Sequence, residues 1–95
     1  MRLERLVSLL KRREDRIDFL EDLITLLIED YELYSEDVLF RDAVEEIYSI
    51  LRSAVLEGKS ELIDAYDLSV LLRASLGEGP SEPKVLLREI LDRLG

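Results

Sequence analysis

Apolar side chains recur at alternating spacings of three and four residues through the first third of the chain. Ten positions form this row, and one of them is charged: Leu3, Leu6, Leu10, Arg13, Ile17, Leu20, Ile24, Leu27, Tyr31 and Tyr34. Such heptad spacing is typical of a helix that packs along another helix. Because no glycine or proline precedes Gly58, we expect one long helix over about residues 3–34.

Six consecutive charged residues, 11–16, interrupt this apolar pattern. A turn could form there, with Asp15 as the N-cap of a new helix and Asp18 at the third position. The run contains no glycine, proline, asparagine or serine, and arginine and glutamate are good helix formers. We therefore predict a continuous helix and keep the turn as the alternative.

Two further helices follow from capping residues and apolar spacing. Ser35 precedes two acidic residues and is the expected N-cap of a helix over 36–57, which ends at Gly58. Ser60 is the expected N-cap of a third helix over 61–76, which a glycine closes.

A loop rich in glycine and proline at 77–83 separates a last helix over 83–94 from the rest. The alternation of apolar and polar residues that is typical of β-strands is absent from the sequence. The pattern predicts an all-α fold: one helical domain over 1–95, similar to a four-helix bundle, with a long N-terminal heptad helix.

The composition narrows the possible chemistry. Hydrophobic residues make up 47% of the chain and charged residues 37%, so a folded, soluble domain is expected. The chain has no cysteine and no histidine, which removes disulfides, thiolate metal sites, cysteine nucleophiles and the commonest general base. We expect a protein that is not an enzyme and that binds no cofactor.

Charge is unevenly distributed along the chain, whose net charge is −9. Residues 1–16 carry six basic and three acidic side chains, whereas 17–46 carry one basic and eleven acidic side chains. This balance argues against nucleic acid as a partner. The six aromatic residues are expected in the core or in an interface rather than on a base-stacking surface: Phe19, Tyr31, Tyr34, Phe40, Tyr48 and Tyr66.

Helix length suggests self-association. A helix over 3–34 would be about 48 Å long, whereas a compact chain of this size is about 32 Å across. Its uncovered apolar stripe would then be an interface, most simply in a homodimer, although a second protein is also possible. The expected interface residues are those of the heptad row: Leu3, Leu6, Leu10, Arg13, Ile17, Leu20, Ile24 and Leu27.

Two acid pairs provide an enzymatic alternative. Glu29 and Glu32, followed by Glu61 and Asp64, resemble the acidic motif of the all-helical nucleoside triphosphate pyrophosphohydrolases of the MazG and dUTPase-like type. The resemblance implies Mg²⁺ held by carboxylates across a helical bundle. The lysine and aromatic residues that would bind the nucleotide have no counterparts in this chain.

A second resemblance covers about residues 17–76. The stretch 40–55 and the helix, glycine and helix pattern of 56–65 are similar to HEPN-type helical bundles. The HEPN ribonuclease motif requires a histidine, so what the resemblance implies is a helical dimer or a protein partner, without that activity.

Two expectations concern the location and the origin of the protein. The first ten residues contain arginine and glutamate and lack a cleavage site, and no apolar run could span a bilayer, so we expect a cytoplasmic protein without membrane contact. The absence of asparagine, glutamine and cysteine resembles thermophile composition and would equally suit a designed protein.

A third functional alternative is an acidic mimic of nucleic acid that inhibits or regulates another protein.

Overall fold

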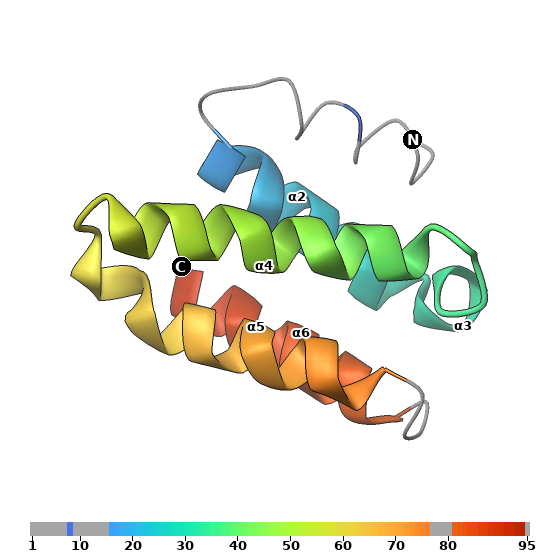
Figure 1. The fold of residues 1–95 in the computed structure, drawn as a ribbon. Coiled ribbons are helices and arrows are strands. Elements are labelled where there is room, and N and C mark those ends of the chain that lie inside the picture. The colour runs from blue at the N-terminus through green and yellow to red at the C-terminus, as the bar shows by residue number, and fades with distance from the viewer. Residues whose placement is uncertain (1–7, 9–15, 77–80, 95) are drawn as a thin grey trace.

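The computed structural model describes residues 8, 16–76 and 81–94 of the chain (Figure 1). Its regular elements are α2 (Arg16–Glu29), α3 (Tyr31–Tyr34), α4 (Phe40–Leu56), the 3₁₀-helix η1 (Ser60–Leu62), α5 (Ile63–Ser75) and α6 (Ser81–Leu94). All regular structure in these described ranges is helical, which confirms the predicted all-α class.

The helices enclose one core. Helix α5 packs against α4 and α6, and α2 packs against α6. Successive helices α4, α5 and α6 run antiparallel, as Figure 1 shows. The largest side chains with no exposed surface come from α2, α4, α5 and α6: Leu20, Leu23, Ile24, Leu27, Val44, Ile47, Leu51, Leu72, Leu87 and Ile90.

The expected helix over 3–34 differs from the structure at its C-terminal end. Helix α2 ends at Glu29, and Asp30 leaves the helical conformation with φ −119° and ψ 42° before the single turn of α3. This break accompanies an aromatic contact made across the next loop. The Tyr31 ring lies edge-on to the Phe40 ring, with centroids 6.0 Å apart. Residues 3–7 and 9–15 of the expected helix lie outside the described residues.

The start of α4 also differs from the prediction. Ser35 does not cap it; the backbone N–H of Ser35 instead donates to the Tyr31 carbonyl and closes α3, and α4 begins at Phe40. The Asp37 carboxylate accepts a hydrogen bond from the Leu39 N–H at 2.9 Å. Such a local side-chain bond offers the backbone an alternative to the helix, so 36–39 form turns.

The end of α4 confirms the predicted role of Gly58. This glycine has φ +101°, a left-handed conformation that other residues rarely adopt. The Gly58 N–H donates to the Val55 carbonyl and the Lys59 N–H to the Ala54 carbonyl, which is a Schellman motif. Ser60 is not the predicted N-cap of the third helix. It is the first residue of η1, whose N-cap is Lys59.

Helix α6 begins at Ser81, two residues before the predicted start. Pro83 therefore lies in its first turn. A proline is tolerated there because the first helical N–H groups have no partner within the helix.

Candidate interaction surface

The predicted self-association row falls partly outside the structure and partly in its core. Four of its eight residues lie outside the described residues: Leu3, Leu6, Leu10 and Arg13. Leu20, Ile24 and Leu27 have no exposed surface, and the half-buried Ile17 packs against the same core. The structure therefore assigns these three leucine and isoleucine side chains to the interior of a single chain rather than to a surface that a second copy could cover.

The two acid pairs of the enzymatic alternative do not meet. Glu29 and Glu32 lie on α2 and α3, whereas Glu61 and Asp64 lie on η1 and α5, at opposite ends of α4 (Figure 1). The 17 residues of α4 correspond to about 25 Å. In the described part of the chain, no group of three or more acidic side chains is placed to hold a metal ion. The magnesium site of the alternative is thus not assembled among these residues.

Two ion pairs with α6 also show that Glu32 and Asp64, one from each acid pair, lie far apart. Lys84 Nζ lies 3.9 Å from Glu32 Oε1, and Arg93 Nη1 lies 3.7 Å from Asp64 Oδ2. The two basic residues stand more than two turns apart on one helix, so their acidic partners are held near different ends of α6. Lys84 is half-buried, and the other three side chains are exposed, so each pair contributes about 1 kcal/mol or less.

A surface along the contact between α4 and α5 combines aromatic, charged and aliphatic side chains. The helical spacings of three and four residues place two rows of side chains beside this contact. We call this surface the α4–α5 seam, and it consists of Glu45, Tyr48, Arg52 and Leu56 from α4, and of Ile63, Tyr66, Val70 and Arg73 from α5.

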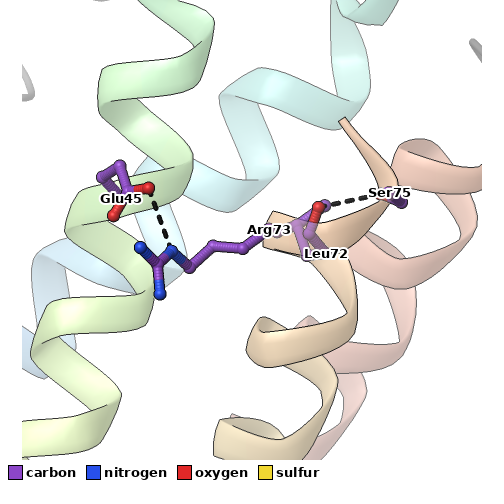
Figure 2. Close-up of polar contacts among 4 residues, drawn as sticks. All are labelled: Glu45, Leu72, Arg73 and Ser75. Atoms are coloured by element: carbon purple, nitrogen blue, oxygen red, sulfur yellow. Dashed lines mark hydrogen bonds and ion pairs between the residues drawn. The ribbon is translucent and has the colours of Figure 1, made fainter. Parts of the chain in front are cut away.

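Arg73 connects the two rows of the seam. Its Nε donates to Glu45 Oε1 at 2.9 Å (Figure 2), and its guanidinium carbon lies 4.2 Å from the centroid of the Tyr48 ring. The hydrogen bond with Glu45 is the main cause of a raised pKa for Arg73. Both charged side chains remain more than two-fifths exposed, so the arrangement is ordered while still reachable from solvent.

The side chain that precedes Arg73 in the sequence belongs to the core. Leu72 is fully buried, and its carbonyl accepts the Ser75 hydroxyl at 2.8 Å (Figure 2). Ser69 likewise donates to the Tyr66 carbonyl at 2.6 Å. Both buried hydroxyls are thus satisfied within their own helix and are not candidates for chemistry.

Two tyrosines form the middle of the seam. The rings of Tyr48 and Tyr66 lie 5.8 Å apart at an interplanar angle of 32°. A hydrogen bond with Tyr48 is the main cause of a raised pKa for Tyr66, and the nearby charge of Arg52 acts in the opposite direction. Both tyrosines are half-buried, which leaves part of each side chain available to a partner.

Aliphatic side chains flank the tyrosines along the seam, and two of them lie toward the turn at Gly58. Leu56 is 72% exposed, Ile63 is 43% exposed and Val70 is 42% exposed. Because α4 and α5 are antiparallel, the contact of Tyr48 with Tyr66 places Leu56 and Ile63 together at the same end of the seam. Exposed aliphatic residues thus lie on the same two helical rows as the tyrosines and Arg73.

The sequence prediction placed Tyr48 and Tyr66 in the core or in an interface without naming a surface. The signal that could have located the seam was present, because both rows follow helical spacing. Spacing alone did not pair the two rows, because it does not show which faces of α4 and α5 lie side by side.

Comparison with protein-family models, with curated proteins and with solved structures finds no match for this chain. In the described ranges, none of the helices combines the length and the hydropathy that a membrane span requires. Inferences about function therefore rest on the chemistry and geometry of the surface itself.

Proposed function

We propose that this protein is a helical protein–protein interaction module and that the α4–α5 seam is its contact surface. The observation that carries the proposal is the half-exposed cluster of Tyr48, Tyr66 and Arg73, held together by a tilted contact between the two rings, a cation–π contact and the ion pair with Glu45. Tyrosine and arginine are the residues most enriched, with tryptophan, among interface hot spots.

The energetics of the seam also favour binding. Fixing an arginine beside a tyrosine ring before a partner arrives lowers the entropy that is lost on association. Exposed aliphatic residues at Leu56, Ile63 and Val70 would add apolar burial around the aromatic centre.

The proposal includes the architecture expected from the sequence, with α2, α4, α5 and α6 as the four helices of a bundle. Catalysis is less well supported, because the chain lacks histidine and cysteine and the two acid pairs of the pyrophosphohydrolase alternative lie at opposite ends of α4. The acidic mimic is supported by the eleven acidic residues of 17–46 alone.

Site-specific photo-crosslinking tests the proposal. A photoreactive residue at Val70 should form an adduct with a polypeptide, whether a second copy or another protein, in native extract. The adduct should disappear when Tyr48→Ala and Arg73→Ala are added. The matched control carries the same photoreactive residue at Val85, which is 52% exposed on α6 and lies outside the seam. Equal adducts at both positions, or none at Val70, would refute the proposal.

A further inference from the structure

The geometry points to a second copy of this chain as the occupant of the α4–α5 seam, with α4 of each protomer lying against α5 of the other. This inference rests on the proposed function, because it names the partner of the same surface. It places self-association on an exposed surface rather than on Leu20, Ile24 and Leu27 of the expected heptad row, which are buried.

Charge favours the seam over the surface of α2 and α3 as a contact for a second copy. Residues 17–46 carry eleven acidic and one basic side chain, so contact between two copies over α2 and α3 would bring like charges together. The seam differs from this acidic part of the chain, because Glu45 is accompanied by Arg52 and Arg73. Two copies can therefore meet here without a large electrostatic cost.

A two-fold axis parallel to the helices makes the seam complementary to itself. Such an axis, running between the two copies along the middle of the seam, places α4 of one protomer opposite α5 of its partner at the same height. Glu45 then faces the partner's Arg73, and Arg73 faces the partner's Glu45. At the next level, Tyr48 and Tyr66 meet the same two rings of the other copy.

The size of the seam predicts a weak dimer. The seam covers about 17 Å of α4, from Glu45 to Leu56, and two helices about 10 Å apart present a strip about 20 Å wide. The strip amounts to about 340 Å² for each protomer, or about 700 Å² in total, which is below the usual size of stable specific interfaces. We therefore expect a dissociation constant of about 100 µM.

Sedimentation equilibrium at protein concentrations from about 5 to 500 µM tests the dimer. The wild type should change from monomer to dimer across this range. Val70→Asp places a charge at the middle of the seam and should weaken association at least about tenfold. The control Val85→Asp adds the same charge on α6 and should leave association within about twofold. Circular dichroism checks that both variants keep their helix content.

A charge exchange between two variants tests the orientation. Glu45→Arg alone and Arg73→Glu alone each put like charges opposite one another across the two-fold axis, so each variant should be monomeric. In an equimolar mixture, the arginine pair of one variant faces the glutamate pair of the other. The mixture should therefore form a heterodimer at least about tenfold more stable than either homodimer. A purely intrachain role for the Arg73 and Glu45 pair predicts no such gain on mixing.

Two results would overturn this inference. One is a monomeric wild type at about 500 µM, and the other is a wild-type dimer that Val70→Asp leaves intact. A mixture of the charge variants that stays monomeric would refute the two-fold orientation. If the photo-crosslink at Val70 joins a different protein while the wild type is monomeric, the second copy is excluded and the proposed interaction function stands.

Discussion

The assignment of Leu27 to the core of a single chain makes a quantitative prediction. Leu27 has no exposed surface and packs within the main hydrophobic cluster. Leu27→Ala removes buried methyl groups and leaves a cavity, so it should lower the free energy of unfolding by about 2–5 kcal/mol. A chain of this length is stable by about 5–14 kcal/mol. The variant should therefore lose a large fraction of its stability, with a melting temperature at least about 8 °C lower.

Urea denaturation followed by circular dichroism measures this loss. The control is Leu33→Ala, the same substitution at a residue of α3 that is 69% exposed, and its effect should stay within about 0.5 kcal/mol. Measured at about 1 and about 10 µM protein, the loss for Leu27→Ala should be the same, because the contact lies within one chain. A loss below about 1 kcal/mol would refute the assignment of Leu27 to the core. A loss that shrinks on dilution would show that Leu27 faces a second chain instead.

Two further predictions concern the turn after α4 and the tyrosines. Gly58→Ala should lower the free energy of unfolding in urea by about 1–2 kcal/mol through backbone strain alone, because φ is +101° and no atom lies within 4 Å of the added Cβ. Gly58→Asn should lower it less, since asparagine tolerates positive φ better than alanine. Equal losses for the two variants would contradict a backbone origin. The pKa of Tyr31 is raised by burial and by Glu32, and that of Tyr66 by the hydrogen bond with Tyr48. Folding thus favours the neutral phenols, so their contribution to stability is complete below the usual pKa of 10.0 and is lost as pH rises through the higher pKa values of the folded state. Near-ultraviolet titration should show both phenols ionising above that value. Tyr31→Phe and Tyr66→Phe should each remove one of these high-pH ionisations.

The helical class and the end of α4 could be predicted because their causes are local. Apolar spacing defines the faces of α4, and a glycine that adopts positive φ closes it at Gly58. The start of α4 was predicted four residues too early because the bond from the Leu39 N–H to Asp37 competes with helix formation. A sequence pattern ranks Ser35 as a cap but does not decide between two competing local hydrogen bonds.

The break at Asp30 accompanies a contact that no helical pattern contains. Tyr31 follows the heptad spacing well enough to extend α2, yet its ring packs edge-on against Phe40, which belongs to the next helix. Tertiary packing overrides local preference in such cases. For the same reason, heptad spacing did not distinguish a partner helix in the same chain from one in a second chain.

The difference between the α2 row and the α4–α5 seam lies in side-chain type rather than spacing. Both follow intervals of three and four residues. The α2 row consists of leucine and isoleucine, whose exposure to water costs free energy, and the chain itself covers these side chains. The centre of the seam presents tyrosine and arginine, whose apolar parts pack on neighbouring helices while their polar ends stay in water, and the exposed Leu56, Ile63 and Val70 lie beside them. The tyrosine and arginine side chains are stable when half-covered and gain further burial when a partner arrives. Spacing therefore locates a helical contact surface, and the polarity of its side-chain tips indicates whether that surface remains open to a partner after folding.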